Sequence, residues 1–427
     1  MARPFFYISA GEPSGDQHAA GLIRELKRRF PDADFLGFGG PEMKKAGCRI
    51  EYDLTGLAVM WFLQAILNIP LFARLLRKAR GVFRRDRPDM LILVDYPGFN
   101  YRLAKHAKAE GIPVCFFVPP QIWAWAQGRI EKTRRDVDFV ISPLPFEQKW
   151  FSSRGVETVA VPHPFFDEMN AEPPDRGFIA SLGAEAEPAP PAEFAPRPLP
   201  AEPILTLLPG SRRSEIAANL PEMARAARLV RDRVPGLRPI VAAYRPAQIG
   251  LIREILRREN ADFPVYAGRT RELIAAGVCA LSVSGSVSIE LLALAKPAVI
   301  YYRVGRFALW FSRFFRRVKY ISLVNLLAAD AAEGESIFCE GSRAPAEPTP
   351  RQREVMLFPE LLTGRDRSAD AADFLTAWLT DPDSLARRRT ELARLRAQVA
   401  SPEGGKSSFE LAADAISARL APGVDPH

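Results

Sequence analysis

The stretch ISAGEPSGDQHAAGLIRELKRRF, residues 8–30, decides the fold. It completes an apolar run that starts at Phe5, turns through small and acidic residues, and continues with apolar residues at helical spacing. Such a strand–turn–helix unit directs backbone N–H groups past the end of the strand, where phosphates often bind. The glycine spacing matches neither the dinucleotide motif GxGxxG nor the P-loop. The stretch therefore predicts the first unit of a parallel α/β sheet.

The same alternation of buried strand and amphipathic helix fills the rest of the first 170 residues. Further apolar runs that read as strands occupy residues 33–39, 89–95, 113–119, 138–143 and 157–162. The rhythm returns later, with runs at 203–211, 237–244, 262–268, 278–286 and 296–304. Continuous apolar strands separated by helices are typical of a parallel, doubly wound sheet. The sequence therefore predicts an α/β fold of two doubly wound, Rossmann-like domains that face a cleft.

The proposed boundaries follow from composition. Residues 1–170 form an N-terminal domain, and residues 171–203, which hold nine prolines, form a Pro/Ala-rich linker. A C-terminal domain occupies residues 204–366, and C-terminal helices occupy 367–427. Ligands are expected in the cleft, at the carboxyl ends of the strands.

Composition limits the partners. The 427 residues carry a formal charge of +8, which favours anionic partners such as phosphorylated metabolites, nucleic acid or a negative membrane leaflet. The four cysteines are far apart without a CxxC pair, and no HExxH is present, so reduced thiols and no metal site are expected. The N-terminus reads as a first strand rather than a signal peptide.

The segment LLPGSRRSEI, residues 207–216, predicts an anion site. A strand ends before Gly210, Ser211 can cap the next helix, and the N–H groups of the turn would face a ligand. Arg212 and Arg213 add guanidinium donors that suit a phosphate. The alternative is a capped helix with solvated arginines.

A second turn of small residues follows about seventy residues later, in VSGSVSIE. Ser284, Gly285 and Ser286 allow a close approach at a strand end, and Glu290 lies one helical turn further on, where it could accept ribose hydroxyls. Glu290 could equally be an ordinary helix-surface residue. Two such turns in one domain favour a nucleotide diphosphate as the ligand.

In the first domain, LILVDYPGFN places Asp95 at the tip of an apolar strand. A carboxylate there could take a proton from an incoming hydroxyl, although strand-tip aspartates also cap helices and turns. Trp123 and Trp125 lie on a proline-rich loop of the same edge. They could stack on a sugar face or plug the loop against the core.

Two aromatic segments predict contact with a membrane surface. Residues 54–73 carry no charge and are followed by a run of basic residues, which suits shallow insertion into an anionic leaflet better than a transmembrane span. Residues 303–320 mix aromatic and basic side chains, a combination that also occurs in proteins that bind nucleic acid. The uncharged run at residues 54–73 argues against nucleic acid as the partner. The residues assigned to this membrane or acyl-chain patch are Val59, Met60, Trp61, Phe62, Phe72, Phe307, Trp310 and Phe311.

Together these motifs resemble the bacterial lipid-A-disaccharide synthase family along nearly the whole chain. The matching stretches, in order, are SAGEPSGD, LAVMWF, VDYPGFNYRLAK, QIWAWAQGRIEK, LPFEQKWF, LLPGSRRSEI, SGSVSIE and ISLVNLLA. The resemblance implies an inverting glycosyltransferase of the two-domain GT-B type, located in the cytoplasm at the inner membrane. It implies UDP-2,3-diacylglucosamine as donor, 2,3-diacylglucosamine 1-phosphate as acceptor, a β-1′,6 linkage, and neither cofactor nor metal.

Family roles carry over by position. Asp95 matches the proposed general base, Arg212 a functional arginine, and Asn325 an asparagine near the donor site. The N-terminal turn comprises Gly11, Glu12, Ser14, Gly15 and Asp16 and is expected to pack closely against the cleft. Gly98 replaces an aspartate common in the family, which leaves Asp95 as the only acid of its motif. A UDP-sugar epimerase, a transferase for another lipid-linked sugar, and a non-catalytic lipid- or nucleotide-binding relative remain alternatives.

Overall fold

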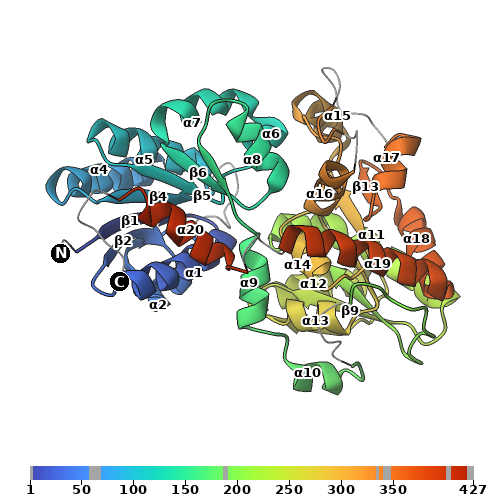
Figure 1. Ribbon diagram of the computed structural model, residues 1–427. Helices are drawn as coiled ribbons and strands as arrows, with labels where there is room; N and C mark the ends of the chain where they lie inside the picture. Colours follow the sequence, from blue (N-terminus) through green and yellow to red (C-terminus); the bar gives the residue numbers. More distant parts are fainter. Residues whose placement is uncertain are drawn as a thin grey trace. The chain divides into compact units, whose positions relative to one another are not determined.

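The computed structural model describes residues 3–56, 69–185, 191–332, 336–339, 348–400 and 405–420. The chain forms two compact units (Figure 1). The first comprises Met1–Glu168 together with Ser401–His427, and the second comprises Met169–Ala400. Within the described ranges, the helices are all too short or too polar to cross a lipid bilayer.

The first unit is built on a seven-stranded sheet in which every pairing is parallel. The strand order is β3-β2-β1-β4-β5-β6-β7. The strands are β1 (Phe5–Ala10), β2 (Asp34–Gly39), β3 (Arg49–Asp53), β4 (Met90–Val94), β5 (Val114–Phe117), β6 (Phe139–Ser142) and β7 (Thr158–Ala160). The central strands are apolar throughout because helices cover both faces.

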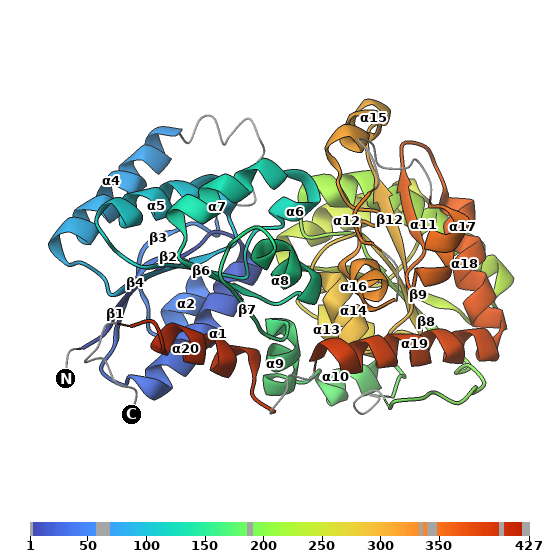
Figure 2. The ribbon, with the colours of Figure 1, turned by 45° about the horizontal axis from the view of Figure 1, so that its top comes forward.

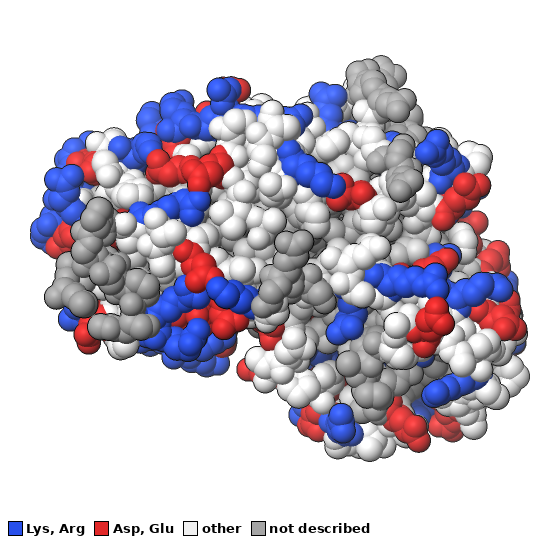
Figure 3. All heavy atoms as spheres, viewed as in Figure 1, with Lys and Arg blue, Asp and Glu red and all other residues white. Residues whose placement is uncertain are grey.

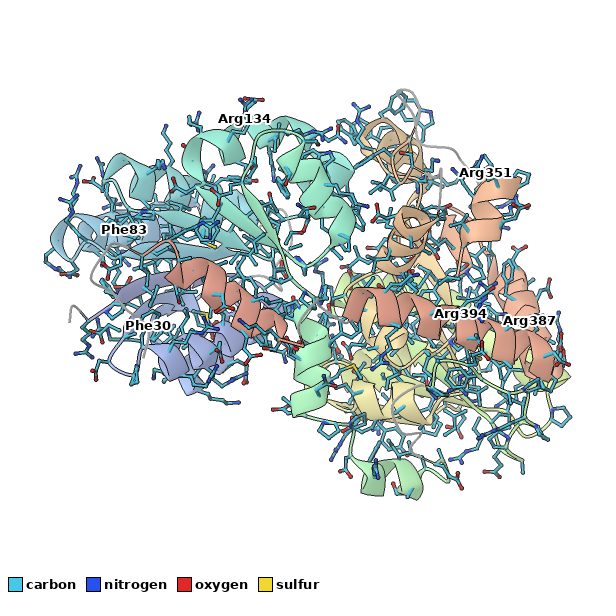
Figure 4. All side chains as sticks on the ribbon, viewed as in Figure 1. Phe30, Phe83, Arg134, Arg351, Arg387 and Arg394 are labelled. Atoms are coloured by element: carbon cyan, nitrogen blue, oxygen red, sulfur yellow. The ribbon has the colours of Figure 1, made fainter. Side chains whose placement is uncertain are left out.

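Two helical layers enclose this sheet. One layer contains α1 (Pro13–Arg29), α2 (Pro41–Lys45) and α20 (Ser408–Ser417), and the other contains α4 (Ile69–Arg85), α5 (Pro97–Ala109) and α7 (Ile130–Asp136) (Figure 2). Alternate residues of β1 serve the two layers, since Phe6 lies 6.4 Å from Phe30 and Tyr7 lies 5.1 Å from Phe83 between ring centroids (Figure 4).

Helix α20 returns the end of the chain to the first unit. A Cβ atom on Gly21 of α1 would lie 2.2 Å from the ring of Phe409, so the ring fits only because position 21 has no side chain. Arg29 donates a hydrogen bond to the carbonyl oxygen of Glu410 at 2.8 Å. Of the C-terminal helices, α20 thus belongs to the first unit, whereas α18 (Ser368–Thr380) and α19 (Pro382–Ala400) belong to the second.

The second unit contains a six-stranded parallel sheet in the order β10-β9-β8-β11-β12-β13. Its strands are β8 (Ile204–Leu208), β9 (Arg238–Ala243), β10 (Val265–Ala267), β11 (Cys279–Ser282), β12 (Ala298–Arg303) and β13 (Glu360–Thr363). The two sheets confirm the predicted class of two doubly wound parallel α/β domains.

Helices cover both faces of the second sheet as well. Leu205 and Leu207 pack with α11 (Arg213–Arg233), α12 (Ile249–Arg258) and α18 (Ser368–Thr380). Thr206, between them, donates to the carbonyl oxygen of Leu273 in α13 on the other face. That face also carries α14 (Val287–Ala293), which contacts α16 (Leu323–Ala331) and α19. The remaining described helices, shorter ones included, are α6 (Ile122–Trp125), η1 (Gln127–Arg129), α8 (Pro145–Ser152), α9 (Pro164–Ala171), α10 (Arg176–Ser181), η2 (Pro246–Gln248), α13 (Thr270–Ala276), α14 (Val287–Ala293), α15 (Arg306–Phe315), α16 (Leu323–Ala331), α17 (Pro350–Val355) and α19 (Pro382–Ala400).

Candidate functional site

Each sheet reverses its strand order at one place, between β1 and β4 in the first unit and between β8 and β11 in the second. At such a switch point the loops leave the two strands toward opposite faces, and a crevice forms at the carboxyl edge. The four motifs singled out from the sequence follow these four strands. The topology thus brings the N-terminal turn beside Asp95, and the Gly210 turn beside the Ser284 turn, within their own units.

The N-terminal turn packs directly against the turn that carries Asp95. A Cβ atom at Gly11 would lie 2.2 Å from the ring of Tyr96, and one at Gly15 would lie 3.4 Å from Val94. Burial raises the pKa of Tyr96, and the nearby carboxylate of Glu12 raises it further. The small residues of SAGEPSGD therefore allow the two turns to touch.

Asp16 has a structural role in this turn. Its buried carboxylate accepts hydrogen bonds from the backbone N–H groups of Gly40 at 2.8 Å, Glu42 at 2.9 Å and Met43 at 3.1 Å. These bonds fix the start of α2 against α1. Burial raises the pKa of Asp16 and outweighs the three hydrogen bonds. Ser14 and Glu12, by contrast, are half-buried at the edge.

The Asp95 turn has an unusual backbone. Asp95 has φ 44° and Tyr96 has φ 50°, and Val118 at the end of the neighbouring strand has φ 51°. Left-handed backbone is costly for side chains other than glycine, and such strain concentrates at functional sites. Asp95 N donates to the carbonyl oxygen of Val118 at 3.2 Å, and Val118 N to that of Ile141 at 3.0 Å. These bonds connect the ends of β4, β5 and β6.

Asn100, which sequence reasoning did not single out, fixes the backbone of the Asp95 turn through hydrogen bonds. Its Nδ2 donates to the carbonyl oxygen of Asp95 at 2.7 Å, and its Oδ1 accepts from Ser9 Oγ at 2.7 Å. Asn100 is fully buried. The final asparagine of DYPGFN therefore orients the backbone of the acid at its start.

The two tryptophans of the QIWAWAQ loop differ in role. Trp123 is fully buried and its Nε1 donates to Glu147 Oε1 at 2.7 Å, so it plugs the loop against the core. Trp125 is 51% exposed and stacks with Arg129, whose guanidinium lies 4.8 Å from its ring centroid. Only Trp125 presents a face that a sugar could contact.

Glu147, in LPFEQKWF, is a second acid near Asp95 that the sequence reading missed. Burial raises the pKa of Glu147 to about 8, and the negative charge of Asp95 adds to this effect, against hydrogen bonds from Ser142 and Trp123 that lower it. The available signal was an acid inside an otherwise apolar segment after a buried strand.

In the second unit, the Gly210 turn is shaped around Glu215. Gly210 has φ 115°, and a Cβ atom there would lie 2.8 Å from Cβ of Glu215. The backbone N–H groups of Ser211 and Arg212 both donate to Glu215 Oε2 at 3.2 Å, and Arg212 Nη1 lies 3.3 Å from Glu215 Oε1. The carboxylate of Glu215 thus occupies the place where these N–H groups could donate to another anion, such as a phosphate.

One detail of this turn differs from the expectation. Arg212, not Ser211, is the N-cap residue of α11, which starts at Arg213. Glu215, in the first turn of α11, accepts from the backbone N–H groups of Ser211 and Arg212, so both residues lie before the helix. Gln248 steadies the turn from the loop after β9, with its Nε2 donating to the carbonyl oxygen of Ser211 at 2.6 Å.

The Ser284 turn lies beside the Gly210 turn, since Val283 N donates to the carbonyl oxygen of Leu208 at 3.0 Å. Ser284 Oγ donates to the carbonyl oxygen of Ile321 at 2.6 Å. Gly285 and Ser286 are exposed, and a Cβ atom on Gly285 would meet nothing within 4 Å. Glu290 is half-buried in α14, one turn beyond. Ser284 therefore holds the turn, and Gly285 and Ser286 form its open surface.

Asn325 is fully buried and uses its amide on the protein itself. Its Oδ1 accepts from the backbone N–H groups of Leu357 at 2.9 Å and Phe358 at 3.0 Å, and its Nδ2 donates to Glu360 Oε1 at 2.8 Å. Glu360 also accepts from the N–H groups of Ile321 at 2.8 Å and Ser322 at 2.9 Å. This Asn325–Glu360 cluster therefore fixes the segment to which Ser284 is bonded.

The aromatic segments have different surroundings. Helix α15 exposes Phe307 (76%), Trp310 (53%), Phe311 (49%) and Phe315 (50%). Phe72 of α4 is half-buried, 5.6 Å from Phe99 and 6.5 Å from Tyr96 between ring centroids, so it packs beside the Asp95 turn. Figure 3 shows lysine and arginine side chains gathered over α4, among acidic ones. Val59, Met60, Trp61 and Phe62 lie outside the described residues.

In the described ranges, no group of three or more His, Cys, Asp or Glu side chains is arranged to hold a metal ion. The polar groups at the two edges are instead hydroxyls, N–H groups, guanidiniums and single carboxylates. Such groups suit the binding of sugar hydroxyls and phosphates.

Comparison with known proteins identifies the family. A model of the lipid-A-disaccharide synthetase family matches residues 6–344. A lipid-A-disaccharide synthase of Trichlorobacter lovleyi is 34% identical over 337 residues, which are 78% of this chain and 84% of that protein. One from Alkalilimnicola ehrlichii is 32% identical over 94% of this chain and 99% of its own length. The chain belongs to the lipid-A-disaccharide synthase family.

Membership in this family confirms the resemblance drawn from the motifs and makes the protein an enzyme, a glycosyltransferase that forms the lipid A disaccharide. Solved structures agree in fold. The UDP-GlcNAc 2-epimerase of Neisseria meningitidis matches with a TM-score of 0.59 at 11% identity, over 98% of this chain and 99% of its own. A glycosyltransferase of kitacinnamycin matches with a TM-score of 0.54 at 14% identity, over 98% and 100%. The chain thus has the GT-B type of fold, with two parallel-sheet α/β domains.

Proposed function

We propose that the protein transfers 2,3-diacylglucosamine from UDP to 2,3-diacylglucosamine 1-phosphate and inverts the anomeric centre to give a β-1′,6 linkage. The observation that carries this proposal is the position of the motifs at the switch points of the two sheets. Asp95, on a left-handed backbone held by hydrogen bonds, lies at the switch point of the first sheet. A turn lined by N–H groups and arginines lies at the switch point of the second sheet. The acceptor is assigned to the first edge and the UDP donor to the second.

In this reaction the carboxylate of Asp95 takes the proton of the acceptor hydroxyl while the hydroxyl oxygen attacks the anomeric carbon of the donor. The bond between that carbon and the UDP oxygen breaks, and UDP leaves as an anion. Its charge is received by Arg212 and by the N–H groups of Ser211 and Arg212, which release Glu215 to do so. Gly285 and Ser286 allow the diphosphate to approach the backbone, with Glu290 assigned to the ribose.

The test is a mass measurement of the product formed from the two defined diacyl substrates. We expect the mass of a tetraacyl disaccharide 1-phosphate and one UDP per product. The β-configuration is checked by the anomeric proton coupling in an NMR spectrum of the product. A control without acceptor should give no product. Absence of disaccharide when both substrates are present would contradict the proposal and leave a non-catalytic binding role.

A UDP-sugar epimerase is the second candidate, because two acids, Asp95 and Glu147, lie near one another in the first unit. Glu147 is only 1% exposed and is engaged by Trp123 and Ser142, which does not suit direct contact with a sugar. Incubation with the UDP-sugar alone distinguishes the two functions. Isomerised sugar would favour the epimerase, and unchanged donor would favour the transferase.

We also propose that the enzyme works at the surface of an anionic membrane, on the cytoplasmic side of the inner membrane. The exposed rings of α15 form one surface, in which Phe307 lies 6.2 Å from Phe311 and Phe311 lies 4.7 Å from Phe315 between centroids. The neighbouring Arg306 and Arg317 are exposed. Aromatic rings beside cations suit shallow insertion among anionic headgroups.

Replacing Phe307, Trp310 and Phe311 together by serine should weaken binding to vesicles of phosphatidylethanolamine and phosphatidylglycerol by about 1,000-fold or more, because each inserted ring contributes roughly 1.5–3 kcal/mol and about 1.4 kcal/mol is tenfold. Co-sedimentation with vesicles measures the effect. Phe374→Ser is the matched control, since Phe374 is 42% exposed in α18. Equal binding of the triple variant and the control would show that α15 does not meet lipid.

A further inference from the structure

The strongest unassigned feature is the buried group formed by Glu147, Trp123 and Ser142 in the first unit, referred to below as the Glu147 cluster. It joins the end of β6 to the two helices that follow β5 and β6. Ser142 ends β6, Trp123 lies in α6 after β5, and Glu147 lies in the first turn of α8. The backbone bonds through Val118 connect the same strand ends to the Asp95 turn.

The hydrogen bonds of the Glu147 cluster fit a neutral carboxylic acid. Trp123 Nε1 donates to Glu147 Oε1, and Glu147 Oε2 lies within hydrogen-bond distance of Ser142 Oγ. The hydroxyl of Ser142 has its own acceptor, the carbonyl oxygen of Leu144 at 3.3 Å. If Glu147 carries a proton, it donates to Ser142 Oγ, and Ser142 donates to Leu144, so every donor has a partner. An ionised Glu147 would instead accept the hydroxyl proton of Ser142, while Leu144 O keeps the backbone N–H donors of Glu147 at 3.0 Å and Gln148 at 3.1 Å.

The charges around Glu147 also favour the neutral form. Its hydrogen-bond partners are an indole and a hydroxyl, both uncharged, and the charged group acting on it is the carboxylate of Asp95. Tyr101 of α5 also faces it, and the charge of Glu147 raises the pKa of that phenol. Arg129 acts on Tyr101 in the opposite direction. In the described part of the chain, no cation is among the groups that shift the pKa of Glu147. A buried carboxylate without a cation is strongly disfavoured.

We infer that Glu147 is a positioning residue for Asp95: it keeps its proton at neutral pH, holds the loops beside the Asp95 turn through neutral hydrogen bonds, and so adds no negative charge beside Asp95. The inference deepens the proposed function, because it takes Asp95 as the base. Loss of the proton at alkaline pH puts a second, repelling charge near Asp95 and redirects the hydroxyl proton of Ser142 from Leu144 to Glu147.

The protonation itself is tested by stability, with no substrate present. The unfolded chain releases this proton near pH 4.5, whereas the folded chain holds it until about pH 8. The folded state therefore binds more protons in that window, and the free energy of unfolding falls as pH rises through it. Glu147→Gln is neutral at every pH and can form the same hydrogen bonds. Its melting temperature should fall less than that of the wild type between these two pH values, and equal slopes would overturn the inference.

The link to Asp95 is tested by the pH profile of kcat/KM. At neutral pH, Glu147→Gln should stay within about twofold of the wild type, because it copies the neutral acid. Above pH 8 the wild type should lose activity while Glu147→Gln does not. A large loss at neutral pH in folded Glu147→Gln, or identical profiles, would overturn the inference. Glu147→Ala leaves Trp123 Nε1 without an acceptor and should melt lower at every pH, with rescue by Gln.

Glu222→Gln provides a matched control. Burial raises the pKa of Glu222 too, and its partners Tyr301 and Arg303 lie in the second unit. This variant should alter the pH dependence of stability without changing the alkaline limb of the rate. If the wild type forms no disaccharide at all, the proposed function fails, and the melting experiment still decides whether Glu147 holds its proton.

Discussion

Asp95→Asn should lower kcat for disaccharide formation by about 10²–10⁴-fold, because an amide cannot take the proton of the acceptor hydroxyl. Asparagine is the informative substitution at this position. Asp95 has φ 44°, and asparagine, like aspartate, tolerates left-handed backbone far better than most residues. The hydrogen bonds from Asp95 N to Val118 and from Asn100 to the Asp95 carbonyl do not involve the side chain and should persist. The measurement is single-turnover transfer with both lipid substrates.

UDP affinity serves as the internal control. The residues assigned to UDP lie in the second unit, so Asp95→Asn should bind UDP as the wild type does, by calorimetry. Asp95→Ala should be less stable than Asp95→Asn by roughly 1–2 kcal/mol, since alanine in left-handed backbone pays the steric cost of its Cβ. Wild-type transfer by folded Asp95→Asn would remove Asp95 from the role of base.

Asn325→Ala should lower the free energy of unfolding of the second unit by about 2–5 kcal/mol, since buried groups left without partners cost about 1–3 kcal/mol each. The substitution removes the acceptor of two backbone N–H groups, at Leu357 and Phe358, and a donor to the buried Glu360. Burial raises the pKa of Glu360, and the hydrogen bonds it accepts, including that from Asn325, lower it again. Thermal unfolding with and without UDP measures the effect.

Two further variants show whether the Asn325–Glu360 cluster is the cause. Asn325→Asp keeps the acceptor but sets a second carboxylate against Glu360, so its stability should recover as pH falls and the pair takes up a proton. Ser322→Ala removes the side-chain cap on the N–H of Asn325 and one side-chain hydrogen bond to Glu360, and should cost about 1–2 kcal/mol. An Asn325→Ala protein with wild-type stability but no UDP affinity would mean that Asn325 contacts the donor directly.

The chemistry of the site was only partly accessible from sequence. Asp95, Gly210 and Ser284 could be selected because acids, glycines and serines directly after apolar strands mark turns at the carboxyl edge of a sheet, where ligands bind. Glu147, Asn100 and Glu215 were missed, because a lone polar residue inside a helix or an apolar segment looks like any surface residue until its neighbours are known. Glu147 acquires meaning from Trp123 and Ser142, which are 24 and 5 residues away along the chain.

Local pattern determined the two doubly wound sheets, because strand and helix periodicity depends on residues only a few positions apart. It also determined that the turns after β1, β4, β8 and β11 are built from small and polar residues. Tertiary structure alone decided the strand order that sets those turns side by side in pairs. It likewise decided which polar side chains are used internally, such as Asp16 and Asn325, and which remain open at an edge. Burial and hydrogen bonding are properties of the neighbours that folding brings together from distant parts of the chain, and no short stretch of sequence contains them.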